Sequence, residues 1–98
     1  MFTEEDIRHV TSVFSALGNP TRFRIIELVS ETKRPLHIKA VAEILSKDYA
    51  AIYRHVKVLR KSGLLEIYEV GRSRVLYIKD VDLVKYFVTF AKNKMRRQ

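Results

Sequence analysis

Apolar residues recur at helical spacing along the first part of the chain. The first such stretch follows Thr3, a suitable N-cap with Asp6 three residues later as a weak capping box, and it stops at Gly18. Its apolar positions are Ile7, Val10, Phe14 and Leu17. The spacing predicts an amphipathic helix between Thr3 and Gly18.

A second helix is predicted from about Pro20 to Ser30, because Asn19 is a good N-cap and proline suits the first helical position. Its expected inward side chains are Phe23, Ile26 and Val29, and its expected outward side chains are Arg22, Arg24 and Glu27. A connector over 32–35 and a short strand over 36–38 follow. The third predicted helix, about Lys39 to Ser46, has an apolar face of Val41, Ile44 and Leu45.

The next segment predicts a helix and then a hairpin. Asp48 is a suitable N-cap and Gly63 a suitable C-terminal residue for a fourth helix. Its apolar stripe is Ile52, Val56 and Leu59. Two β-rich runs, 64–70 and 75–78, flank the turn sequence Gly71-Arg72-Ser73-Arg74 and predict a β-hairpin. A last helix is expected from Asp80 to about Met95.

These elements predict one α+β domain, mainly α, over residues 1–98: a winged helix-turn-helix with about five helices and a β-hairpin wing. No apolar run approaches the roughly 18 residues of a membrane span, so we expect no membrane partner. The acidic N-terminus does not resemble a secretory signal, and the expected location is the cytoplasm.

The last predicted helix is apolar over more than half its circumference. A helix that covers one small core needs only one apolar stripe, so the extra face needs another partner. Burial within its own domain is the alternative, but a second copy of the chain covers an aromatic patch most simply. The first and last helices therefore predict a homodimer, whose interface residues are Ile7, Val10, Phe14, Leu83, Val84, Phe87, Val88, Phe90 and Ala91.

The charge of the chain is concentrated in its middle. The net charge is +8, and residues 32–79 carry eleven Lys or Arg against four Asp or Glu, a net of +7. Clustered basic charge favours a polyanionic partner, although a solubilising surface is the alternative.

The side of the fourth helix opposite its apolar stripe is cationic and aromatic. We expect this helix, about 48–62, to enter the major groove of duplex DNA, where arginine can bind guanine bidentately. The predicted base-reading residues are Tyr49, Ala50, Ala51, Tyr53 and Arg54. The predicted backbone contacts, which position the protein without specifying sequence, are Lys47, His55, Lys57, Arg60 and Lys61.

The hairpin turn is cationic as well. Arg72 and Arg74 flank Ser73 directly after Gly71, and we expect this wing, 71–74, to contact an adjacent groove or the DNA backbone. Each feature alone has an ordinary alternative: a solvated helix face, or a charged tip that discourages edge pairing. Their order and spacing together favour double-stranded DNA.

Two segments carry a resemblance to a known family. Residues 16–26, ALGNPTRFRII, and residues 55–65, HVKVLRKSGLL, resemble the corresponding motifs of the ArsR-type repressors of bacteria and archaea. Gly71-Arg72-Ser73 lies where their wing glycine and arginine lie, and the resemblance covers about residues 10–79. It implies a winged-helix dimer that binds a near-palindromic operator, represses transcription and dimerises through its first and last helices.

The chain departs from that family at several positions. It has no cysteine, and its three histidines, His9, His37 and His55, lack metal-ligand spacing, so we expect no metal and no cofactor. Ala50 and Ala51 replace the usual Ser or Thr, and Lys47 replaces a usual Leu, so the operator sequence of relatives does not transfer. A small-molecule effector is not identifiable from the sequence.

The residues also bear on classes of function other than DNA recognition. The sequence shows no Ser/His/Asp set, no paired inward carboxylates and no phosphate loop, so we expect no enzyme. A winged helix can also serve as a protein-interaction module, or as a DNA-architectural protein with little sequence preference, because a fold does not determine function.

Overall fold

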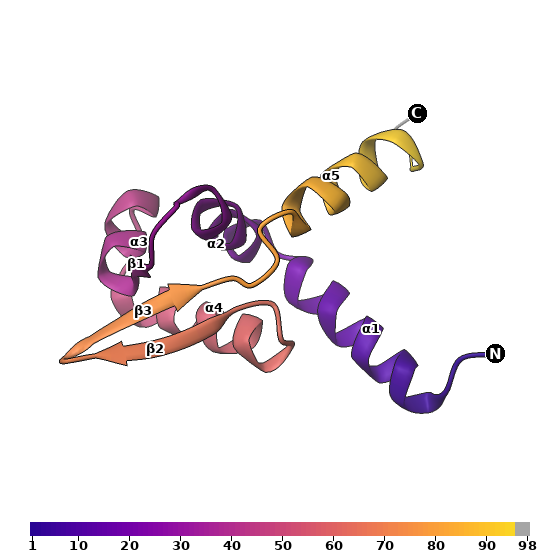
Figure 1. The fold of residues 1–98 in the computed structure, drawn as a ribbon, viewed down its shortest axis with the longest axis horizontal. Helices are drawn as coiled ribbons and strands as arrows, with labels where there is room; N and C mark the ends of the chain where they lie inside the picture. The colour runs from indigo at the N-terminus through magenta and orange to yellow at the C-terminus, as the bar shows by residue number, and fades with distance from the viewer. Residues whose placement is uncertain (96–98) are drawn as a thin grey trace.

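The computed structural model describes residues 1–95, and within them the chain forms five helices and a small sheet (Figure 1). The order of elements is α1 (Glu4–Leu17), α2 (Pro20–Glu31), β1 (Leu36–His37), α3 (Ile38–Leu45), α4 (Tyr49–Lys61), β2 (Glu66–Val70), β3 (Ser73–Tyr77) and α5 (Leu83–Asn93). This order confirms the predicted winged helix-turn-helix.

Three predicted N-caps are present and make the expected hydrogen bonds. The side chains of Thr3, Asn19 and Asp48 accept hydrogen bonds from backbone N–H groups three residues later, at 3.0, 3.0 and 2.7 Å. At Thr3 the capping box is complete, because the Asp6 carboxylate also accepts from the Thr3 N–H. These caps satisfy N–H groups that have no partner inside the helix, and they fix where α1, α2 and α4 begin.

The turn between α3 and α4 depends on one residue in a left-handed conformation. Ser46 has φ 55° and ψ 45°. Its N–H donates to the Glu43 carbonyl at 3.2 Å, and the Lys47 N–H donates to the Ala42 carbonyl at 2.9 Å. This Schellman pattern ends α3 and turns the chain sharply into α4.

Helix α4 ends in the same way, here at a glycine. Gly63 has φ 85°, its N–H donates to the Arg60 carbonyl, and the Leu64 N–H donates to the Leu59 carbonyl, both at 3.0 Å. Glycine adopts this conformation without the penalty that a Cβ atom brings. The predicted helix end at Gly63 is confirmed.

The sheet has the order β1-β3-β2, and both pairings are antiparallel. Val70 pairs with Ser73, so the hairpin turn contains only Gly71 and Arg72. The predicted four-residue turn was too long, because Ser73 and Arg74 belong to β3. Gly71 alone has a positive φ, 62°, which is the sign pattern of a type II′ turn.

The core lies between α2, α3, α4 and the sheet. All three predicted stripe residues of α4, Ile52, Val56 and Leu59, are fully buried. Around them pack buried side chains from the other elements, Ile25, Ile26, Ile38, Val41, Leu65 and Leu76. Because this stripe faces the core, the opposite side of α4 faces solvent.

Two predictions about helices were wrong. Ile44 is 57% exposed, because Ile38, Val41 and Ala42 form the buried face of α3 and Ile44 lies outside it. The last helix begins at Leu83 rather than at Asp80. The Asp80 carboxylate accepts from the Asp82 N–H at 3.0 Å, and this local turn occupies the residues before the helix.

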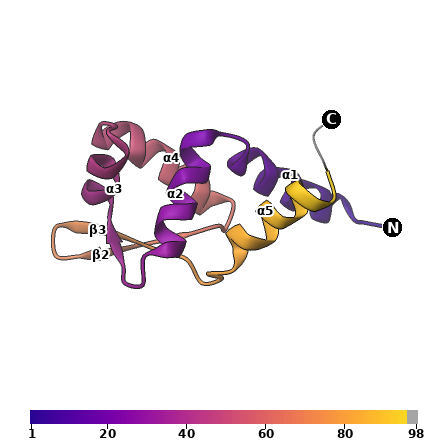
Figure 2. The ribbon, with the colours of Figure 1, turned by 90° about the horizontal axis from the view of Figure 1, so that it is seen from above.

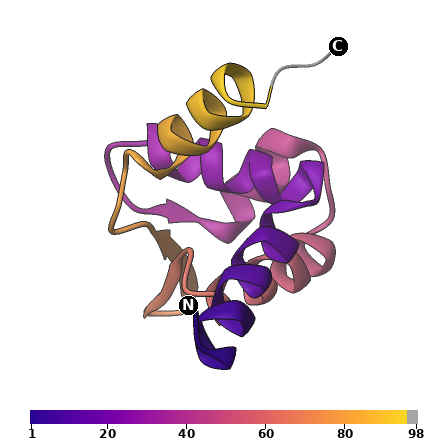
Figure 3. The ribbon, with the colours of Figure 1, turned by 90° about the vertical axis from the view of Figure 1, so that its right-hand side faces the viewer.

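Helices α1 and α5 project from the end of the molecule opposite the hairpin tip (Figures 1 and 2). No residue of α5 is buried, and the two helices diverge from their base (Figure 3). The radius of gyration is 14.3 Å, above the ~13 Å typical of a compact domain of this length. None of the helices described is long and apolar enough to cross a membrane.

Candidate nucleic-acid interface

The outward side of α4 presents a cationic and aromatic surface. Tyr49 is 39% exposed, and Ala50 and Arg54 are also exposed, while Ala51 and Tyr53 are half-buried. The exposed cations beside them are Lys47, Lys57, Arg60 and Lys61. We call this set of nine residues the α4 face. All of the predicted base-reading residues lie together on it, in the first half of the helix.

The hairpin is attached to the α4 face by an aromatic cluster. The Tyr49 and Tyr53 rings are stacked with centroids 6.3 Å apart. The Arg74 guanidinium carbon lies 4.4 Å from the Tyr53 centroid, and the Lys57 Nζ lies 5.0 Å from it. Arg74 also donates to the Tyr49 hydroxyl at 3.2 Å. The two contacts of Arg74 place the hairpin beside the N-terminal half of α4.

The predicted wing residues therefore have different surroundings. Arg72 is exposed in the two-residue turn at the hairpin tip. Arg74 is held over Tyr53 instead of projecting from the tip, and its hydrogen bond to Tyr49 raises its pKa. Ser73 is half-buried in β3. Only Arg72 extends the α4 face beyond the helix.

The predicted outward position of Arg22 was wrong. Its side chain turns back from the first turn of α2, where its Nε donates to the Ala16 carbonyl at 2.6 Å. One terminal nitrogen donates to the Ser15 carbonyl at 3.3 Å, and the other lies 3.2 Å from Nδ1 of His55. A guanidinium has donors only, so His55 Nδ1 accepts this bond and the proton of the neutral ring lies on Nε2.

His55, predicted as a backbone contact, is thus a half-buried residue that faces the α1–α2 junction. Burial lowers the pKa of His55 below its ordinary 6.5, and the positive charges of Arg22, Arg54 and Lys47 lower it further. The imidazole is neutral at pH 7 as a result. Sequence reasoning missed its contact with Arg22 because the two residues lie 33 positions apart.

The predicted dimer residues divide into two groups. Leu83 and Val84 pack against the core of their own chain, and Phe87 is half-buried against Phe14 with ring centroids 6.1 Å apart. The remaining residues form an exposed apolar surface on α1 and α5, which we call the α1/α5 face: Ile7, Val10, Phe14, Val88, Phe90 and Ala91.

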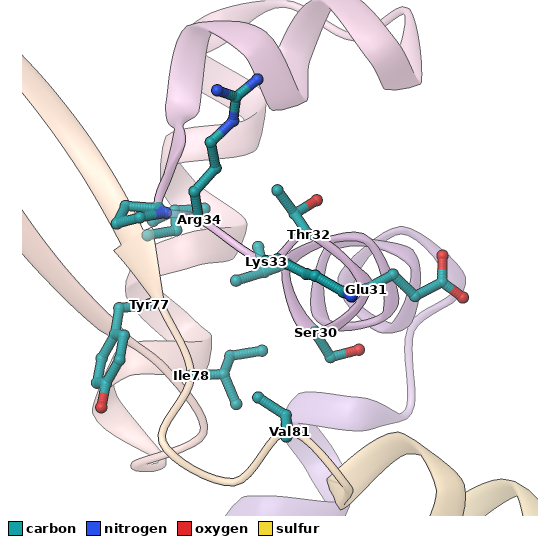
Figure 4. Close-up of a pocket in the computed structure, with 11 residues that line it drawn as sticks. Ser30, Glu31, Thr32, Lys33, Arg34, Tyr77, Ile78 and Val81 are labelled. Carbon is teal, nitrogen blue, oxygen red and sulfur yellow. The ribbon is translucent and has the colours of Figure 1, made fainter.

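A cavity of about 510 Å³ lies away from the α4 face, between the end of α2 and the β3–α5 linker (Figure 4). Val29, Leu76 and Ile78 are buried in its wall, while Lys33 and the exposed Val81 lie at its rim. No residue predicted to contact DNA lines it. In the part of the chain that the structure describes, no three His, Asp or Glu side chains come together to hold a metal ion.

Comparisons with known proteins show the family of the chain and several relatives. Residues 18–83 match the model of the family described as HVO_A0114. The chain is 31% identical over 84 residues to the HTH-type transcriptional regulator MJ1325 of Methanocaldococcus jannaschii, covering 86% of this chain and 92% of the relative. It is 30% identical over 59 residues to the HTH-type regulator B-115 of Sulfolobus spindle-shape virus 1, covering 60% of this chain and 50% of the relative.

Solved structures share the fold. The homodimeric winged helix-turn-helix domain of Mb0332 from Mycobacterium bovis, a possible ArsR-family regulator, superposes with a TM-score of 0.82 at 17% identity, covering 99% of this chain and 94% of that one. A transcriptional regulator homologue from Pyrococcus horikoshii gives 0.72 at 24% identity, with 90% and 94% covered. The chain belongs to the HVO_A0114 family, and it is a winged helix-turn-helix, DNA-binding transcription regulator.

Proposed function

We propose that the chain binds specific duplex DNA as a homodimer and represses transcription, with α4 in the major groove and the hairpin on the adjacent groove or backbone. The observation that carries the proposal is the contact of Arg74 with Tyr49 and Tyr53, because it puts the hairpin and the α4 face on one side of the molecule. The resemblance to ArsR-type repressors supports repression as the outcome.

Residues of the α4 face are suited to base contacts or to phosphate contacts according to their position along the helix and their charge. Arg54 is exposed in the half of the helix that enters the groove first, and arginine can bind guanine through two hydrogen bonds. Lys57, Arg60 and Lys61 lie further along and are suited to phosphate contacts, which give affinity without sequence preference. Ala50 leaves room for the backbone of α4 to approach the bases.

The α1/α5 face supports the dimer. Its exposed aromatic and aliphatic side chains need a cover, and a twofold axis would let each copy cover the other. The Mb0332 domain, which shares the fold, is a homodimer, and this supports a dimer here. Two α4 helices related in this way would enter successive major grooves about 10 base pairs apart.

The first test is selection of bound duplexes from a random pool, followed by a salt titration of the selected duplex. We expect a steep linear fall of log affinity with log salt, with a slope of about −0.9 for each phosphate contact. No binding to any duplex, or binding without salt dependence, would refute the proposal. Equal affinity for selected and random duplexes would indicate an architectural protein instead.

Variants of the α4 face assign the individual roles. Arg54→Ala should reduce the preference for the selected sequence, whereas Lys61→Ala should weaken all duplexes alike and reduce the slope by about 1.8, or 0.9 for each of two copies. Lys85→Ala is the matched control, because Lys85 is exposed on α5 and outside the α4 face. If Arg54→Ala keeps the full sequence preference, the assignment of Arg54 is wrong.

A further inference from the structure

The side chain of Arg22, which belongs to α2, makes hydrogen bonds to two other helices, α1 and α4. It projects from α2, donates to the Ser15 and Ala16 carbonyls of α1, and donates to His55 of α4. The last carbonyls of a helix have no partner inside the helix, and a cation near them is favoured by the helix dipole. Arg22 therefore satisfies the end of α1 while it holds α4.

The local sequence places Arg22 within reach of the end of α1. Asn19 caps α2 by accepting from the Arg22 N–H at 3.0 Å, and Pro20 fixes the first helical position. Arg22 is therefore in the first turn of α2, close to the end of α1. Because side chains of a helix point back toward its N-terminus, the long Arg22 side chain can reach α1.

The two helices that Arg22 joins carry different parts of the function. Helix α1 provides half of the α1/α5 face, and α4 provides most of the α4 face, which contacts DNA in the proposed function. His55 lies in the middle of α4, between the base-reading positions and the phosphate-contact positions. A change in the Arg22–His55 contact would alter the angle between the dimer helix and the DNA-reading helix.

We propose that Arg22 is a positioning residue for DNA recognition: by donating to His55 and to the end of α1, it sets the orientation of α4 relative to the dimer helix. The proposal rests on the proposed function of α4. Arg22 acts through His55 and need not contact DNA itself. Charged groups around His55 are Arg22 from α2, Arg54 from α4 and Lys47 from the α3–α4 turn.

The test is a double-mutant cycle on affinity for the selected duplex, using Arg22→Met and His55→Leu. Each single change should weaken binding by about tenfold, in line with the loss of a hydrogen bond to a charged group. The double variant should be no weaker than either single variant, because both remove the same contact. His55→Asn should restore near wild-type affinity, since its amide oxygen can accept in place of Nδ1.

Two controls separate positioning from direct contact. Arg24→Met removes an exposed arginine of the same helix and should leave affinity unchanged. The slope of log affinity against log salt should stay unchanged in Arg22→Met, whereas a lost phosphate contact would reduce it by about 0.9 per copy. Wild-type affinity in Arg22→Met, a reduced slope, or losses that multiply in the double variant would each overturn the proposal.

Two NMR measurements on the free protein test the positioning role of Arg22 without DNA. Imidazole ¹⁵N chemical shifts should identify Nδ1 of His55 as the unprotonated nitrogen, and residual dipolar couplings should report a changed α1–α4 angle in His55→Leu. If wild-type protein binds no duplex, the proposed function fails. If Nδ1 carries the proton, or the angle is unchanged, the positioning role fails by itself.

Discussion

Truncation of Phe14 is the sharpest test of the proposed dimer. Phe14 of the α1/α5 face is 55% exposed, and its ring also packs against that of Phe87. In the single chain, this exposed part of the ring is apolar surface that a partner would bury. Phe14→Ala removes most of that area and leaves the backbone of α1 free to form its helix.

The expected effect follows from the exposed fraction. A phenylalanine offers ~200 Å², so 55% exposure leaves ~110 Å² free. If the partner covers this area, it contributes ~2.8 kcal/mol at 25 cal/mol per Å². Alanine retains part of the contact, so the loss is ~2 kcal/mol per copy and ~4 kcal/mol per dimer. The dimer dissociation constant should rise roughly a thousandfold.

Sedimentation velocity over a series of protein concentrations measures this constant. Val70→Ala is the matched control, because Val70 is 61% exposed but is the last residue of β2, next to the hairpin turn. The hairpin tip lies at the end of the molecule opposite α1 and α5 (Figure 2). The Val70→Ala variant should dimerise as the wild type does. Far-UV circular dichroism checks that α1 is intact in Phe14→Ala. A dissociation constant within about threefold of wild type in a folded Phe14→Ala would refute the dimer face.

Three further predictions concern stability. Gly63→Ala should lower the free energy of unfolding by about 1 kcal/mol in urea titrations. The cause is the backbone φ of 85°, because no neighbouring atom lies close enough to crowd an added Cβ. An equal loss in Gly63→Asn would contradict this reason. Ser46→Gly should raise the free energy of unfolding by up to about 1 kcal/mol, since Ser46 has φ 55°; a loss of stability would argue against strain at the turn. The lowered pKa of His55 means that the folded state binds its proton more weakly than the unfolded state. Its stabilising contribution should be complete above pH 6.5 and decline as the pH falls from 6.5 through the folded-state pKa. His55→Asn should reduce that decline, and an unchanged pH profile would show that His55 does not contribute.

Local signals in the sequence predicted most of the helix ends. Thr3, Asn19 and Asp48 act as caps through side-chain bonds to residues three positions away, so their chemistry is visible in a short window. Gly63 ends α4 for the same local reason. The α4 face was predictable because the buried stripe of one helix determines its opposite side.

Contacts between distant segments were not predictable in this way. Arg22 looks like an ordinary outward residue of α2, and the packing of α2 against the end of α1 and against His55 of α4 turns it inward. Arg74 looks like a free wing cation until the hairpin is seen to pack on Tyr53. Helical spacing puts Ile44 on one apolar face with Val41 and Leu45, but the α3 surface that meets the core does not include Ile44.

Strand β1 is only two residues long, but it connects two parts of the fold. It pairs with β3 at the root of the hairpin and runs directly into α3, so it links the hairpin to the α3–turn–α4 unit. The α5 helix joins this unit through the 78–82 linker. If the chain binds DNA as proposed, the choice of bases and the separation of half-sites would be encoded in different stretches of chain. Substitutions remote from DNA would then change the spacing of the operator while its half-site sequence stayed the same.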